Sequence, residues 1–200
     1  MEKIVYLSDN MPSYPYPTLA LAGREVLVLP YTLHGRATLG LIRRLAPDML
    51  VTDCRKLPAE PVLPCPVSNG SLLRLALLPR MLDSRCPGWQ DRTISIDCGK
   101  KGGILAACLL AEESSFLLLT GKNAPETCRL IFRRNGCILR QNNEPLPLAA
   151  ISLPRTVNTC RGKLPLCLAE GFLRLIRPIF PTPKGLMAMA RLAADHGISV

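Results

Sequence analysis

Aromatic side chains are scarce in this sequence, which has four Tyr, four Phe and one Trp among its 200 residues. Sites for single-stranded nucleic acid stack bases on aromatic side chains along a basic groove. The net charge of +10 would suit such a partner, but the basic residues are scattered. The sequence therefore argues against nucleic acid as a partner, and it favours a small anionic ligand or a charge that serves solubility alone. The densest basic pairs, each in a different predicted element, are Arg43/Arg44, Lys100/Lys101 and Arg133/Arg134.

Histidine is rarer still, since only His34 and His196 are present and they lie far apart in the chain. There are nine cysteines, an odd number, and no two of them form a C-x-x-C pair. Structural zinc sites commonly use such pairs, and a disulfide framework uses an even number of cysteines. The sequence thus predicts no metal site and no disulfide framework. We expect the thiols within apolar segments to pack as small hydrophobic groups.

Long apolar runs are also missing, and none approaches the roughly 18 residues that a membrane span requires. The run at 104–111, for example, is soon followed by charged residues. The first eight residues enter a strand-like segment directly and lack the pattern of a signal peptide. We therefore expect a cytoplasmic protein that makes no membrane contact.

What is present is an ordinary globular composition, with 48% hydrophobic and 20% charged residues. Predicted strands and helices alternate along the chain, which favours an α/β fold built on a parallel sheet with helices on both faces. The predicted strands are 3–8, 24–30, 48–53, 93–97, 116–120, 137–140 and 150–153. The predicted helices are 35–46, 71–82, 103–113, 125–135, 166–176 and 183–196.

Four prolines crowd the segment 58–66, at positions 58, 61, 64 and 66. Proline supplies no backbone N–H to a sheet, so such a segment is typical of a linker or crossing segment. We therefore predict two domains. Residues 1–66 form a small β/α lobe, and residues 67–200 form a Rossmann-like nucleotide-binding domain with C-terminal helices.

A glycine-rich turn follows the predicted strand 93–97. On the G-x-G-x-x-G template, Gly99 and Gly102 take the second and third places, Gly103 follows, and Asp97 stands where the first glycine belongs. Glycines let the backbone turn tightly and approach a pyrophosphate, which the N-terminus of the next helix attracts. A carboxylate at position 97 would repel that phosphate. The pattern predicts the turn, and it leaves open whether the turn holds a phosphate.

The second strand of this half ends in Thr120-Gly121-Lys122-Asn123. An acidic residue at this place would bind the ribose of NAD, and none is present, whereas Lys122 would neutralise the 2′-phosphate of NADP. Asn123 is placed to cap the helix that follows. If a dinucleotide binds, the sequence therefore favours NADP, with Gly99, Gly102, Gly103, Lys122 and Asn123 as the cofactor-binding residues.

From about residue 67 the order of segments resembles the Rossmann domain of the predicted amino-acid dehydrogenases related to long-chain acyl-carrier-protein reductases, themselves similar to glutamyl-tRNA reductase and shikimate dehydrogenase. The segments that carry the resemblance are Asn69-Gly70-Ser71-Leu72, Thr120-Gly121-Lys122-Asn123, Cys167-Leu168-Ala169-Glu170 and Ala194-Asp195-His196-Gly197-Ile198. The chain departs from the family in being shorter before Cys167. No single motif is intact, so the resemblance describes a shortened and degenerate version.

The resemblance implies that Cys167 accepts an acyl group from a thioester, as a thiolate is suited to do. Glu170 would orient Cys167, or it would only be a first-turn carboxylate that favours the helix dipole. The alternative for Cys167 is a buried cysteine that packs in a core. Two functions follow: an NADP-dependent oxidoreductase of the acyl-thioester reductase or amino-acid dehydrogenase type, or a catalytically inactive Rossmann-like binding or regulatory protein. A homodimer is left open.

Overall fold

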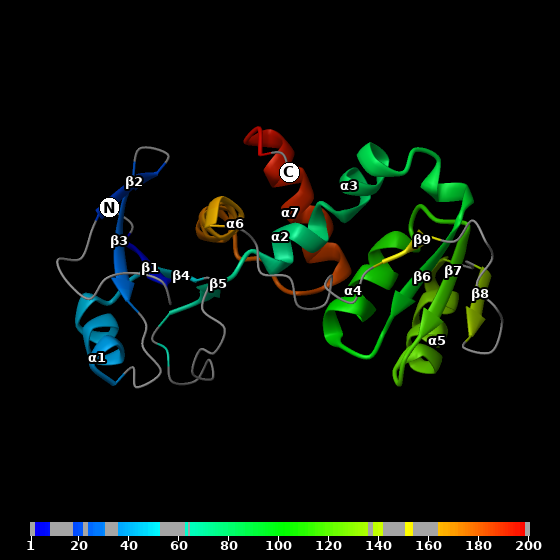
Figure 1. Cartoon of the computed structure of the whole chain (residues 1–200), viewed down its shortest axis with the longest axis horizontal. Helices are drawn as coiled ribbons and strands as arrows, with labels where there is room; N and C mark the ends of the chain where they lie inside the picture. Colours follow the sequence, from blue (N-terminus) through cyan, green and yellow to red (C-terminus); the bar gives the residue numbers. More distant parts are fainter. Residues whose placement is uncertain are drawn as a thin grey trace. The chain divides into compact units, whose positions relative to one another are not determined.

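The computed structural model describes residues 3–8, 18–21, 24–30, 36–52, 63, 65–135, 138–141, 151–153 and 164–198. Two compact units make up the chain. The first unit comprises residues 1–71 and 161–178, and the second comprises residues 72–160 and 179–200. The predicted boundary segment, 58–66, lies largely outside the described residues. Both units are built on a parallel sheet, so the predicted α/β class is confirmed at this level (Figure 1).

The sheet of the first unit has the strand order β2-β3-β1-β4-β5. The pairs β1–β3, β1–β4 and β4–β5 are parallel, and β2 adds an antiparallel edge on β3. Mixed sheets of this kind commonly carry the antiparallel strand at an edge. The strands are β1 (Ile4–Ser8), β2 (Thr18–Leu21), β3 (Arg24–Pro30), β4 (Met49–Thr52) and β5 (Val67–Ser68).

Two helices cover opposite faces of this sheet. Ile4 and Tyr6 of β1 pack in one apolar cluster with Cys167 of α6 (Leu164–Ile176). The alternate residues Val5 and Leu7 pack in a second cluster that contains Ile42 of α1 (Arg36–Leu45). Because successive side chains of a strand point to opposite faces, α1 and α6 lie on the two sides of the sheet.

The second unit contains a four-stranded sheet with the order β8-β7-β6-β9, in which every pair is parallel. The predicted run of parallel strands over residues 93–153 is therefore confirmed. The crossover from β6 to β7 and the crossover from β7 to β8 move in the same direction across the sheet. Because such crossovers are right-handed, α4 and α5 lie on the same face of the sheet, and the two helices contact each other. These elements are β6 (Thr93–Asp97), α4 (Lys101–Leu110), β7 (Phe116–Thr120), α5 (Ala124–Asn135), β8 (Ile138–Gln141) and β9 (Ile151–Ser152).

The helices outside the sheet of the second unit follow local signals. The predicted helix 71–82 is two helices, α2 (Ser71–Ala76) and α3 (Leu78–Arg85), and Pro79 stands in the first turn of α3, where a missing N–H is tolerated. A short 3-10 turn, η2 (Trp89–Asp91), buries the single Trp of the chain. In α7 (Pro183–Asp195), the Oγ1 atom of the N-cap Thr182 accepts a hydrogen bond from the Gly185 N–H at 3.1 Å. No described helix is long and apolar enough to cross a membrane.

One helix lies outside its predicted domain. The sequence placed residues 166–176 in the second domain, whereas α6 packs on β4 and β5 of the first unit. Gly171 explains how closely α6 approaches this sheet. A Cβ at this position would stand 3.0 Å from Val51 Cγ2 and 3.4 Å from Met49 Cγ. The apolar face of α6 thus finds its partner among strands that lie about a hundred residues or more earlier in the chain.

This close approach predicts opposite outcomes for two helical glycines. Gly40 lies within α1, and a Cβ added to it would have nothing within 4 Å, so Gly40→Ala should raise the free energy of unfolding by about 0.5–1 kcal/mol. Gly171→Ala gains the same helix propensity but crowds Val51, so we expect no net gain. Calorimetric unfolding of both variants measures the difference. Equal stabilisation by both would contradict the close packing of α6.

Candidate functional site

The candidate site of the second unit is the turn between β6 and α4. The Cys98 N–H donates to the Thr120 carbonyl at 2.7 Å, which carries the pairing of β6 and β7 one residue beyond the strands. The Asp97 carboxylate then turns back, and its Oδ1 atom accepts the Gly99 N–H at 2.8 Å. The residue in the first-glycine place therefore supplies an anion to the turn from its own side chain. An amide that a phosphate would contact is already hydrogen bonded.

Gly121, at the end of β7, packs directly against this turn. Its φ is +89°, a conformation that L side chains rarely adopt. A Cβ there would stand 2.5 Å from Asp97 Oδ1 and 2.8 Å from the Gly99 nitrogen. The glycine is thus required both by its backbone conformation and by the closeness of Asp97. The sequence analysis placed Gly121 at a strand end and assigned it no packing role. Its contact, Asp97, lies on a different strand, so sequence spacing did not indicate it.

Asn123 joins the two turns. Its Nδ2 atom donates to the Cys98 carbonyl at 2.9 Å, and its own carbonyl accepts the Thr127 hydroxyl at 2.7 Å. Asn123 precedes the first residue of α5, as the sequence predicted for a residue at the helix start. Its side-chain amide holds the β6–α4 turn to the β7–α5 turn. The predicted role in cofactor binding stays a prediction.

The first turn of α4 has no side-chain cap. Lys100 is the N-cap residue, and its carbonyl accepts the N–H groups of Gly103 at 3.1 Å and Ile104 at 3.3 Å. Gly102 is half-buried and Gly103 is buried, while Lys100 and Lys101 are exposed. Lys122, at the end of β7, is exposed as well. Three exposed lysines thus stand in the two turns at the ends of β6 and β7, together with the partial positive charge of the N-terminus of α4.

The β6–α4 turn lies at the topological switch point of the second sheet. The chain continues from β6 to β7 on one side of β6, and β9 pairs with β6 on the other side, so the strand order reverses at β6. In open parallel α/β sheets, ligands bind outside the carboxyl ends of the strands at such a point. The structure thus brings Gly99, Gly102, Gly103, Lys122 and Asn123 to one edge of the second unit.

Three buried thiols belong to the turn and to the two helices α4 and α5, those of Cys98, Cys108 and Cys128. Burial raises the pKa of the Cys98 thiol to about 11, and a hydrogen bond with the Thr127 side chain offsets part of this effect. A thiol with so high a pKa is neutral and unreactive near neutral pH. Within the described ranges, no group of Cys, His, Asp or Glu is arranged to hold a metal ion.

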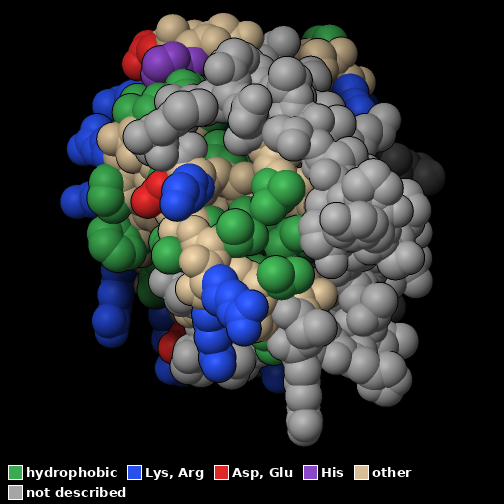
Figure 2. All heavy atoms as spheres, turned by 90° about the vertical axis from the view of Figure 1, so that its left-hand side faces the viewer, with side chains coloured by type: hydrophobic (Ala, Val, Ile, Leu, Met, Phe, Trp, Pro, Cys, Tyr) green, Lys and Arg blue, Asp and Glu red, His purple; other side chains and the backbone are tan. Residues whose placement is uncertain are grey.

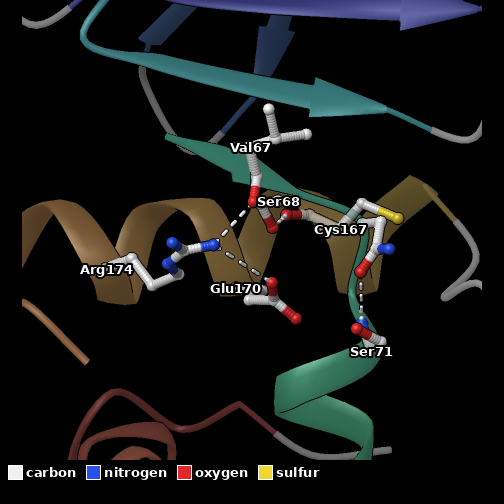
Figure 3. A network of polar contacts seen from close by, with 7 residues as sticks. Val67, Ser68, Ser71, Cys167, Glu170 and Arg174 are labelled. Atoms are coloured by element: carbon white, nitrogen blue, oxygen red, sulfur yellow. Dashed lines mark hydrogen bonds and ion pairs between the residues drawn. The ribbon is translucent and has the colours of Figure 1, made fainter. Parts of the chain in front are cut away.

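The two predicted catalytic residues lie in the first unit, on α6. Cys167 is fully buried among apolar side chains of β1, β3 and β4, and its carbonyl accepts the Ser68 hydroxyl at 2.8 Å. Glu170 is 1% exposed, and its Oε1 atom lies 3.8 Å from Nη1 of Arg174 (Figure 3). The packing of Cys167 matches the alternative of a core cysteine. The cation that pairs with Glu170 is Arg174, one helical turn away. No sequence signal pointed to Arg174.

The basic side chains among the described residues come from several elements. On the face seen in Figure 2, Lys and Arg side chains stand at several separate places. The sequence and its elements show the same scatter, with basic residues at the ends of α1, α4 and α5. The preference for a small anionic ligand over nucleic acid stays a prediction.

The chain matches no protein-family model, and comparisons with the curated proteins and with the solved structures give no match. The resemblance to amino-acid dehydrogenases therefore rests on the sequence segments quoted above.

Proposed function

We propose that this protein is a non-catalytic, Rossmann-like binding protein that takes a small anionic ligand of the nucleotide class at the β6–α4 turn. The observation that carries the proposal is the turn itself. A glycine-rich strand-to-helix connection lies at the switch point of a parallel sheet and is bordered by three exposed lysines. This is where α/β sheets bind nucleotides, and the lysines supply the charge that phosphate groups require.

Asp97 argues against tight binding of a pyrophosphate. Its carboxylate accepts the Gly99 N–H at 2.8 Å, so a phosphate in the turn would meet a negative charge and an occupied donor. The turn thus fits a pyrophosphate poorly, and we derive no hydride transfer through it. An anionic ligand would instead contact the side chains of Lys100, Lys101 and Lys122.

The burial of Cys167 supports the non-catalytic function. A cysteine nucleophile has to meet its thioester as a thiolate, and reactive cysteines lie in partly exposed, electropositive surroundings. Cys167 is 0% exposed and is packed among apolar side chains. These surroundings are typical of a structural cysteine.

A second candidate is the NADP-dependent oxidoreductase, and Lys122 is the observation that favours it. The segment that ends β7 carries the exposed cation of Lys122 and no acidic residue of its own. That arrangement suits a 2′-phosphate. In this case, NADP is the expected cofactor.

Isothermal titration with NADP, NAD, ATP and a coenzyme A thioester separates the two functions, together with an assay of NADPH oxidation in the presence of the thioester. The binding protein should bind at least one of these ligands and oxidise no NADPH. Steady NADPH oxidation that is lost in Cys167→Ser would establish the oxidoreductase instead. Absence of binding by any ligand, with the protein folded, would contradict both functions.

Lys122 provides a matched prediction on ligand choice. Lys122→Ala should weaken NADP binding by about fivefold and leave NAD binding nearly unchanged, because only NADP carries a 2′-phosphate for the ammonium group. Lys184→Ala is a suitable control, since Lys184 is also a lysine of the second unit but lies on α7. Wild-type protein that binds NAD as tightly as NADP would show that Lys122 does not contact the 2′-phosphate.

A further inference from the structure

Arg174 is held in the first unit by one nitrogen of its guanidinium group. Nη1 donates to the Val67 carbonyl of β5 at 2.6 Å and lies 3.8 Å from Glu170 Oε1. Figure 3 shows both contacts reaching the same nitrogen, with the rest of the guanidinium turned away from Glu170. The orientation of Arg174 is therefore set from one side only.

Burying Glu170 carries an energetic cost. Its side chain is only 1% exposed, and a carboxylate removed from water needs a charged or hydrogen-bonding partner. The long separation from Arg174 makes this pair a weak contributor to stability. What the two contacts do provide is position, because a backbone carbonyl and a buried carboxylate together restrain the Nη1 atom. A guanidinium held in this way has lost part of its rotamer freedom before any ligand arrives.

The other edge of the guanidinium carries the Nε and Nη2 atoms. Within the described part of the chain, Arg174 makes no hydrogen bond through Nε or Nη2, and its side chain is 21% exposed. Nε and Nη2 together form the fork that matches the two oxygens of a carboxylate or of a phosphate.

We propose that Arg174 is the anchor of an anion-binding site in the first unit, where its Nε and Nη2 atoms bind the carboxylate or phosphate group of a small ligand. The buried carboxylate of Glu170 and the Val67 carbonyl position the guanidinium, and neither contacts the ligand. The site lies on α6 and is independent of the β6–α4 turn in the second unit. If Arg174 binds no anion, the function proposed for the β6–α4 turn is unaffected. If the β6–α4 turn binds no ligand, the site proposed at Arg174 is unaffected.

The test is nuclear magnetic resonance of the arginine Nε–H groups in the full chain, titrated with acetate, succinate and inorganic phosphate at constant ionic strength. Sodium chloride serves as the ionic control. We expect a saturable shift of the Arg174 Nε–H signal with at least one probe and none with chloride. The probe that binds more tightly tells a carboxylate ligand from a phosphate ligand. The signal is assigned by its loss in Arg174→Lys.

Two variants separate a binding site from a structural contact. Arg174→Lys keeps a cation near Glu170 but loses the fork, so the probe affinity, followed at the backbone amides of Val67 and Ser68, should fall by about fivefold or more. Arg177→Lys, one turn along and exposed, should change nothing. The proposal is overturned if no probe gives a saturable shift, if Arg174→Lys binds as the wild type does, or if Arg177→Lys loses as much affinity as Arg174→Lys.

Discussion

Asp97→Gly should strengthen the binding of a dinucleotide or nucleoside phosphate by more than about tenfold, which corresponds to about 1.4 kcal/mol. The substitution removes the carboxylate whose Oδ1 atom accepts the Gly99 N–H at 2.8 Å. It frees that amide for a phosphate oxygen and removes a like charge from the turn. A term of this size is modest for a partly buried charge. The affinities of wild type and variant are compared by isothermal titration.

Asp97→Asn separates the two effects of this carboxylate. An asparagine amide oxygen can still accept the Gly99 N–H, but it brings no negative charge. If charge repulsion dominates, Asp97→Asn should recover most of the gain. If the occupied amide dominates, only Asp97→Gly should improve binding. A wild-type protein that binds NADP at micromolar levels and is weakened by Asp97→Gly would show that Asp97 takes part in the site.

Gly121→Ala should destabilise the second unit by about 2–5 kcal/mol, the sum of a strained backbone and an overpacked contact. The φ of +89° disfavours any L side chain, and the new Cβ would stand 2.5 Å from Asp97 Oδ1. Urea unfolding measured by fluorescence is direct, because the single Trp of the chain, Trp89, is fully buried in the second unit. Its indole N–H donates to Asp83 Oδ1 at 2.8 Å, so unfolding changes its surroundings.

Gly88→Ala is the matched control for the contact. Gly88 has a φ of +73° but nothing within 4 Å of the Cβ position, so only the backbone cost of about 1 kcal/mol applies. The double variant Asp97→Gly/Gly121→Ala should recover part of the loss, since it removes the nearest atom and leaves the Gly99 nitrogen at 2.8 Å. Equal destabilisation by Gly88→Ala and Gly121→Ala would contradict the packing of Gly121 on the β6–α4 turn.

The parallel strands of residues 93–153 could be predicted from sequence because their signals are local. β6 and β7 are short apolar runs, a helix follows each of them, and Gly99 and Gly102 mark the turn between β6 and its helix. A strand, a turn and a helix of this kind leave few topologies, since crossovers between parallel strands are right-handed. The position of Asn123 just before a helix was readable for the same reason.

Tertiary structure decided what these local signals leave open. An apolar helix face shows that α6 is buried, but not against which sheet, because hydrophobic burial has no direction. The close approach at Gly171 to Val51 and Met49 selects the first unit, and with it the burial of Cys167. Most strands and helices could thus be predicted from neighbours in sequence, whereas β2 and β5 were not predicted and the helix predicted over 71–82 is two helices. The contact of Gly121 with Asp97 and the fixation of Arg174 by Val67 depend on segments far apart in the chain, and only folding brings those segments together.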